Sequence, residues 1–175
     1  MIHAKPDHGH VETPVLSRFP IDMSQTHDLS YKSFEPRGCF QVDVQISESQ
    51  CLHVFNVHLG TTYAERWVQA QVLISSKILE NPQLRHPRIM LGDFNDWTQG
   101  PVSRLLARHL VSADVGAHLR CRRTYPGLFP LVHLDHVYFD PSLQLESLKL
   151  YRSRTAIVAS DHLPLLADFQ LPVTS

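Results

Sequence analysis

The stretch Arg88-Ile89-Met90-Leu91-Gly92-Asp93-Phe94-Asn95 joins a short apolar run to a group of polar residues. Residues 88–91 are expected to form a short buried strand, and functional side chains often follow such an element. Alternation along an extended chain places Asp93 and Asn95 on one side and turns Phe94 toward the core. The stretch therefore predicts a carboxylate and an amide in one cavity. Taken alone, it is equally typical of an Asx-rich turn.

Strands are expected on both sides of this stretch. Residues 40–46 alternate apolar and polar side chains, which predicts a half-buried strand, and the denser apolar run at 52–59 predicts a more central one. A turn at 47–50 would join the two as a hairpin. Further strands are expected at 133–139, 143–151 and 163–171.

Two helices are predicted. Thr62 and Glu65 form a capping-box pattern, and apolar side chains at helical spacing, with Trp67 assigned to the helix core, continue to Asn81-Pro82. Pro101, near the start of 102–110, marks a second helix there. Because strands outnumber helices and hairpin-like connections are frequent, the pattern favours a mixed α/β (α+β) fold over a doubly wound parallel sheet.

The composition fits one soluble domain. With 175 residues, of which 43% are apolar, the chain can bury one substantial core. The formal net charge of −1 provides no global positive field for nucleic acid or an anionic membrane, so phosphate recognition has to be local. Cys39, Cys51 and Cys121 form no C-x-x-C pair, which argues against a disulfide framework and a zinc knuckle. Without a signal-peptide pattern or a long apolar run, we expect a cytoplasmic protein with no stable membrane insertion.

The first residues differ from the rest of the chain. Residues 1–14 carry Pro6, Gly9 and Pro14 among polar residues and show no periodicity, so an irregular N-terminal segment is expected there. Residues 15–172 are expected to form one domain.

Two further carboxylates and a histidine belong to the later part of the chain. Asp161 and His162 are adjacent, and Asp135 lies in an earlier predicted strand. One carboxylate can hold Mg²⁺, which prefers oxygen ligands, while the other orients His162 as an acid–base group. A structural ion pair is the alternative interpretation of this pattern.

Seven motifs occur in one order over residues 16–169. They are Leu16-Ser17-Arg18-Phe19-Pro20-Ile21, Glu35-Pro36-Arg37-Gly38, Asn56-Val57-His58-Leu59, Gly92-Asp93-Phe94-Asn95-Asp96-Trp97, Arg123-Thr124-Tyr125-Pro126, Leu134-Asp135-His136-Val137-Tyr138 and Ser160-Asp161-His162-Leu163-Pro164. This order resembles the endonuclease/exonuclease/phosphatase superfamily, and the details are most similar to its small, stand-alone bacterial members.

The resemblance implies a role for each matching residue. His162 would be the general base that prepares the attacking water, with Asp135 as its orienting partner and Asp161 as a metal ligand. His58 would contact the scissile phosphate, either as an acid or as a stabiliser of the transition state.

The same resemblance implies a metal cofactor, Mg²⁺ or Mn²⁺. Asp93 and Asn95 would hold the nucleophile and a non-bridging oxygen, and would join the metal shell when a second ion binds. Arg123, with Thr124 beside it, is a weaker candidate for binding the substrate phosphate, because guanidinium groups suit phosphate oxygens. A merely solvated basic run, which includes Arg120 and Arg122, explains the arginine as well.

The resemblance also implies a missing part. Family members begin with a strand that carries an Asn, and a later strand ends in a Gln-Glu pair that binds metal; neither Glu12 nor Glu35 matches that position. The expected fold is therefore a partial four-layer α-β-β-α sandwich of the deoxyribonuclease-like type, the C-terminal two-thirds, lacking the first β-α-β portion. Such a chain is expected to bind metal more weakly and to expose apolar surface that favours self-association.

The predicted function is a divalent-metal-dependent phosphoesterase. It would hydrolyse a phosphodiester, in nucleic acid or a phospholipid head group, or a phosphomonoester, by His-activated water attack. The alternative is a truncated, weak or inactive remnant that acts at most as a binding module. A zinc hydrolase is disfavoured, because no H-x-H-x-D-H or H-E-x-x-H pattern occurs. The substrate does not follow from the fold, although the near-neutral charge argues mildly against a tight nucleic-acid binder.

Overall fold

The computed structural model describes residues 2–4, 14–85, 87–97, 100–113, 123–128 and 131–172. Its centre is a six-stranded sheet in the order β3-β4-β5-β6-β8-β7. Only β5 and β6 pair in parallel, and the other neighbours are antiparallel. The strands are β3 (Ile21–Asp28), β4 (Gly38–Ser47), β5 (Gln50–His58), β6 (Arg88–Asp93), β7 (Val111–Ser112) and β8 (Asp135–Phe139).

Two smaller strand pairs accompany the main sheet. β9 (Gln144–Leu150) and β10 (Leu165–Gln170) are antiparallel with one register shift, and α4 (Arg154–Ala159) lies between them in the chain. β1 (Ile2–Ala4) pairs with β2 (Val15–Ser17). Residues 2–4, part of the segment expected to be irregular, thus form a strand through backbone pairing, which needs no apolar alternation. Residues 5–13 lie outside the described part of the chain.

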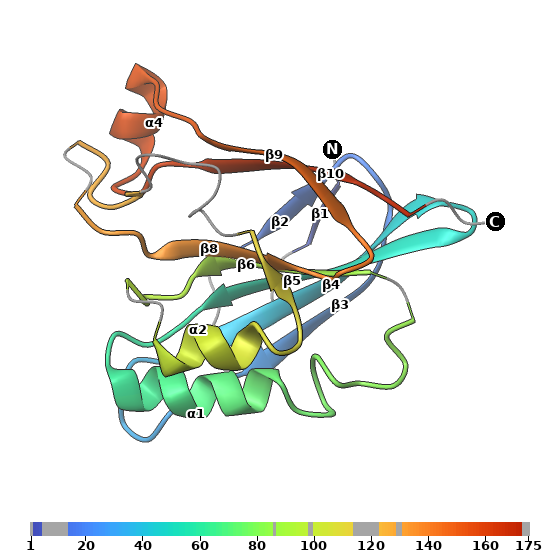
Figure 1. Ribbon diagram of the computed structural model, residues 1–175, viewed down its shortest axis with the longest axis horizontal. Coiled ribbons are helices and arrows are strands. Elements are labelled where there is room, and N and C mark those ends of the chain that lie inside the picture. The colour runs from blue at the N-terminus through green and yellow to red at the C-terminus, as the bar shows by residue number, and fades with distance from the viewer. Residues whose placement is uncertain are drawn as a thin grey trace.

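The main sheet is covered on both faces (Figure 1). Helices α1 (Tyr63–Leu73) and α2 (Pro101–Leu106) lie on one face, and β9 and β10 lie on the other. Buried Phe55, Leu73 and Leu106 belong to the cluster between the sheet and the helices, whereas Val137 and Leu148 belong to the cluster between β8 and the β9–β10 pair. The mixed α/β class predicted from the sequence is confirmed.

Helix α1 begins as predicted and ends earlier. The Thr62 hydroxyl accepts a hydrogen bond from the Glu65 backbone N–H, and the Glu65 carboxylate accepts one from the Thr62 backbone N–H at 3.0 Å. The helix ends at Leu73 instead of reaching Asn81. The buried apolar side chains that were expected on further helical turns lie on non-helical turns after Ile74. The assignment of Trp67 to the helix core is wrong: the side chain is 38% exposed and stacks on Tyr63.

Helix α2 ends earlier than the predicted 102–110, and turns replace its last part. Strand β3 was not predicted because Ile21–Asp28 is mostly polar; it lies at the edge of the sheet and pairs through its backbone with β4. No helix within the described residues is long and apolar enough to cross a membrane.

An ion pair connects Arg88, the first residue of β6, with Asp140, the residue after β8. The Arg88 guanidinium donates to Asp140 Oδ2 at 2.7 and 3.0 Å and to the Leu79 carbonyl at 2.8 Å. Burial raises the pKa of Asp140, but the hydrogen bonds from Arg88 and Ser142 outweigh this effect and leave that pKa below its usual range.

We therefore expect Asp140→Asn to lower the free energy of unfolding by about 1–2 kcal/mol at neutral pH. Because the folded-state pKa is lowered, the ion pair stabilises the protein above the ordinary carboxyl pKa of about 4, and this advantage disappears as pH falls through the lowered pKa. Urea unfolding at several pH values measures the difference. A gap between variant and wild type that stays constant in acid would contradict the ion-pair explanation.

Candidate functional site

Six residues predicted from the sequence line one cavity of about 650 Å³. The register of the sheet explains how three of them meet, because His58 of β5 is the ladder partner of Asp93 of β6, and Asp93 is the partner of Asp135 of β8. Directly paired residues present their side chains on the same face of a sheet. The remaining three are Asn95, which follows β6, and Asp161 and His162, which precede β10.

The end of β6 has a backbone that requires glycine. Gly92 has φ +133°, and a Cβ at this position would lie 2.0 Å from the Val57 carbonyl oxygen. Only glycine adopts this conformation at low cost, so it lets β6 approach β5 closely where the two strands end.

Asp93 and Asn95 form an Asx turn, and both also line the cavity. The stretch is therefore both of the things that its sequence indicates, a turn and a pair of polar groups in one cavity. The Asn95 backbone N–H donates to Asp93 Oδ1 at 2.8 Å, in an Asx turn, and Asn95 has φ +48°. The Asn95 side-chain amide donates to the Leu59 carbonyl at 2.8 Å, so its own carbonyl oxygen is the group available to a ligand. Phe94 is buried in the core, as predicted.

His162 and Asp135 form a hydrogen-bonded pair. Nδ1 of His162 lies 2.8 Å from Asp135 Oδ2, and its Nε2 lies 3.9 Å from Asp93 Oδ2. Burial lowers the pKa of His162, but the hydrogen bond to Asp135 and the nearby carboxylates of Asp93 and Asp161 outweigh it, so the pKa is raised. A carboxylate at Nδ1 fixes the ring so that Nε2 faces the cavity.

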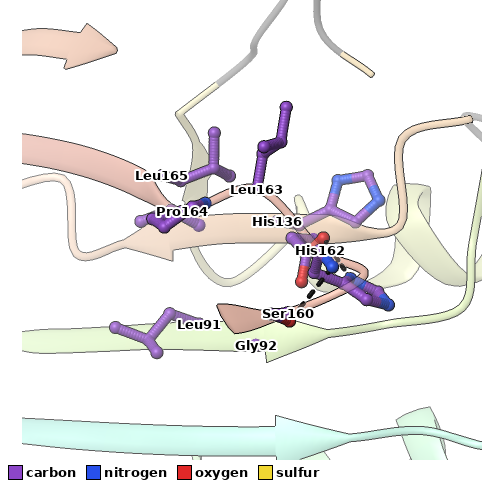
Figure 2. A pocket seen from close by; sticks show the side chains of 10 residues that line it. Leu91, Gly92, His136, Ser160, His162, Leu163, Pro164 and Leu165 are labelled. Carbon is purple, nitrogen blue, oxygen red and sulfur yellow. Dashed lines mark hydrogen bonds and ion pairs between the residues drawn. The ribbon is translucent and has the colours of Figure 1, made fainter. Parts of the chain in front are cut away.

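His162 also borders a second pocket of about 330 Å³ (Figure 2). Apolar side chains dominate its wall, including Leu91, Leu163 and Leu165, and Asp135 and His162 line both spaces. Figure 2 shows the loop that carries His162, where the His162 backbone N–H donates to the Ser160 hydroxyl at 3.1 Å. The histidine therefore stands where a polar cavity adjoins an apolar pocket.

Arg37 is a site residue that the sequence interpretation did not select. Its Nη1 lies 3.1 Å from His58 Nε2 and 3.3 Å from His58 Nδ1, and Glu35 accepts a hydrogen bond from its Nη2 at 2.7 Å. Burial and then the Arg37 charge lower the pKa of His58, although Asp93 lies 3.6 Å away. Arg37 belongs to the Glu-Pro-Arg-Gly motif, so the signal was present in the sequence.

The Asp93 carboxylate lies near one other carboxylate, Asp135, and near two histidines, His58 and His162. Burial and the neighbouring Asp135 raise its pKa, whereas the hydrogen bond from Asn95 and the two histidines lower it by less. Burial and a neighbouring carboxylate therefore disfavour the charged form of Asp93.

The two weaker candidates for phosphate binding, Arg123 and Thr124, do not line this cavity. Thr124 is fully buried, and its hydroxyl accepts a hydrogen bond from the Leu134 backbone N–H at 3.3 Å, so it is structural. Arg123 lines a separate pocket with Trp97 and Leu131. The next residue of that motif, Tyr125, lines the cavity and places its ring 5.0 Å from the His162 ring. Glu12, Arg120 and Arg122 lie outside the described residues.

Comparison with known proteins identifies the family of the chain. The sequence pattern of the Endonuclease/Exonuclease/phosphatase family matches residues 5–162. The chain is 34% identical over 171 residues to the uncharacterized protein YbhP of Escherichia coli strain K12, and the match covers 93% of this chain and 64% of YbhP. The chain thus spans less than two thirds of the length of that relative.

Solved structures share the fold at lower identity. A mannosyl-6-phosphatase of Bacteroides thetaiotaomicron superposes with a TM-score of 0.71 at 17% identity, covering 87% of this chain and 67% of the phosphatase. TDP2 of D. rerio, solved with a single-stranded DNA product, superposes with a TM-score of 0.69 at 18% identity, covering 87% of this chain and 69% of TDP2.

Proposed function

The chain belongs to the endonuclease/exonuclease/phosphatase family, whose members are hydrolases of phosphoester bonds, and from this premise we propose that it is a divalent-metal-dependent phosphoesterase. The proposed reaction is attack of a water molecule on a phosphodiester or phosphomonoester. The observation that carries the proposal is the convergence of His58, Asp93, Asp135 and His162 on one cavity through adjacent strand ends and one loop.

His162 is the proposed general base. The Asp135 carboxylate accepts from its Nδ1 at 2.8 Å, which leaves Nε2 as the proton acceptor toward the cavity. A water near Nε2 and Asp93 would give its proton to His162, and the resulting imidazolium would be stabilised by Asp135.

The oxygen donors of the cavity fit Mg²⁺ or Mn²⁺. Asp161 and Asp93 offer carboxylates, and Asn95 offers the amide oxygen that its bond to Leu59 leaves available. Burial and the neighbouring Asp135 raise the pKa of Asp93, and a bound cation would stabilise its charged form. When bound, the ion supplies charge neutralisation to the phosphoryl oxygens.

His58 and Arg37 are the proposed phosphate-binding pair. Because burial and Arg37 lower the pKa of His58, the imidazole is neutral near pH 7, which favours a role as hydrogen-bond donor over a role as acid. Arg37 supplies the permanent positive charge beside it.

Hydrolysis of a generic aryl phosphodiester and of the matching monoester tests the proposal. We expect release of the aryl alcohol with Mn²⁺, its loss on addition of EDTA, and its return when Mn²⁺ is in excess. The ratio of the two rates assigns the preferred ester class. Absence of turnover on both esters, in protein that shows a cooperative thermal transition, would contradict the proposal and favour an inactive remnant.

Arg37→Ala is expected to lower kcat/KM by about 10–100-fold, because one charge-assisted hydrogen bond to phosphate is removed. Arg37→Lys retains the charge without the planar fork and should fall between alanine and wild type. Arg123→Ala serves as the control, since its side chain lines a different pocket and the wild-type rate should remain. Equal losses in Arg37→Ala and Arg123→Ala would refute this assignment.

A further inference from the structure

A second group of metal-ligating side chains lies on the β4–β5 hairpin. The ligand atoms of Asp43, Cys51 and His53 all lie within 4.8 Å of one another. His53 is buried, while Asp43 and Cys51 are partly exposed, so the group is accessible from one side. Carboxylate, thiol and imidazole together form a donor set with one oxygen, one sulfur and one nitrogen.

The strand register produces this group. Asp43 is the ladder partner of His53, and Cys51 is two residues from His53 on β5, so alternation directs the three side chains to the same face. His53, the member of the group nearest to the cavity along β5, is five residues from His58, so about 17 Å of extended chain separates these two histidines.

Two carboxylates lie near the thiol. Burial, then Asp43 and Asp22, raise the pKa of Cys51 to about 11. A metal ion that binds Cys51 would therefore have to displace the thiol proton, which would pass to solvent.

We propose that Asp43, Cys51 and His53 bind one transition-metal ion of the Zn²⁺ class, at a site separate from the catalytic cavity. A thiolate beside an imidazole selects borderline-soft ions over Mg²⁺. Three protein ligands leave the fourth tetrahedral position to water or to another ligand.

The competing explanation is a hydrogen-bonded network across three strands. His27 contacts Gln41 at 3.0 Å, Gln41 donates to Asp43 Oδ1 at 3.2 Å, and the same oxygen lies 2.7 Å from His53 Nδ1. Metal binding would open the last contact by a few tenths of an ångström, because two ligands of one tetrahedral ion lie about 3.3 Å apart. The network orients Asp43 but assigns no role to Cys51, and this difference allows a test.

Co²⁺ titration followed by absorption spectroscopy provides the test, because a thiolate ligand gives a charge-transfer band that oxygen and nitrogen ligands do not. The Cys39→Ala/Cys121→Ala variant leaves Cys51 as the sole thiol and should show the band at one equivalent of Co²⁺, which Zn²⁺ should remove by competition. Cys51→Ala should lose the band. His162→Ala should keep it, so the result is independent of the proposed catalytic function.

Asp43→Asn provides a second variant that conserves shape, and we expect it to weaken Co²⁺ binding by about tenfold or more. If Cys51→Ala does not show a cooperative thermal transition, the Co²⁺ affinity of Asp43→Asn tests the site instead. Absence of the band in the single-thiol variant, its persistence in Cys51→Ala, or unchanged affinity in Asp43→Asn would overturn the proposal.

Discussion

Replacement of His162 by alanine is expected to lower kcat by about 10²–10⁴-fold, the usual contribution of a positioned general base. Its Nε2 faces the cavity, 3.9 Å from Asp93 Oδ2, while Asp135 holds Nδ1 at 2.8 Å. The free energy of unfolding should change by less than about 1 kcal/mol, because the side chain is partly exposed. Steady-state hydrolysis of the aryl phosphodiester with Mn²⁺ measures the first quantity, and urea unfolding measures the second.

His109→Ala is the matched control. His109 and His162 have the same side-chain exposed fraction, 26%, and each has a carboxylate partner, which for His109 is Glu80 at 3.5 Å. We expect the His109 variant to keep the wild-type rate. A His162→Ala protein with more than about a tenth of wild-type kcat would remove His162 from the role of general base.

Gly92→Ala is expected to be the most damaging small substitution in the fold. The added Cβ would lie 2.0 Å from the Val57 carbonyl oxygen and 3.0 Å from Asn56 Oδ1, at a φ of +133°. The strain and the steric clash should lower the free energy of unfolding by about 3 kcal/mol or more. Because Asp93 is the next residue, phosphoesterase activity should fall as well. Urea unfolding and the hydrolysis assay measure both effects.

Gly127→Ala supplies the comparison. A Cβ at Gly127 would meet its nearest neighbour, the Ser160 carbonyl oxygen, at 3.4 Å. This substitution should change stability by less than about 1 kcal/mol. Unfolding of Gly92→Ala at the same urea concentration as Gly127→Ala would contradict the claim that Gly92 is needed for the close approach of β6 to β5.

The sequence predicts the elements whose periodicity is strong. The alternation at 40–46 and the apolar run at 52–59 correspond to β4 and β5, and the capping box marks the start of α1. The sequence predicts the edge strand of the sheet and the ends of helices less well. Strand β3 is mostly polar and depends on backbone pairing with β4, and the end of α1 is set by turns whose apolar residues mimic helical spacing.

In the candidate site, too, features with a local sequence pattern are predicted, and features that depend on tertiary contacts are not. Motifs at strand ends predict which residues meet, because the ends of neighbouring strands share an edge, and the structure brings His58, Asp93 and Asp135 together there. Arg37 lies in a motif that the sequence showed, but it was not selected because its contact with His58 arises from tertiary structure. Thr124 was named because it lies beside Arg123 in the sequence, whereas its burial depends on the tertiary packing. The Asp43–Cys51–His53 group arises from cross-strand register, which spacing along the chain does not reveal.

Mn²⁺ titration, observed through the imidazole signals in an NMR spectrum, tests the central claim most directly. The paramagnetic ion broadens nearby nuclei, and Mn²⁺ prefers the oxygen ligands that Asp93, Asn95 and Asp161 offer. We predict that His58 and His162 broaden first, at substoichiometric Mn²⁺, while His109 remains sharp. Equal broadening of all histidines, or no broadening of His58 and His162, would contradict a metal-assisted phosphoesterase site in this cavity.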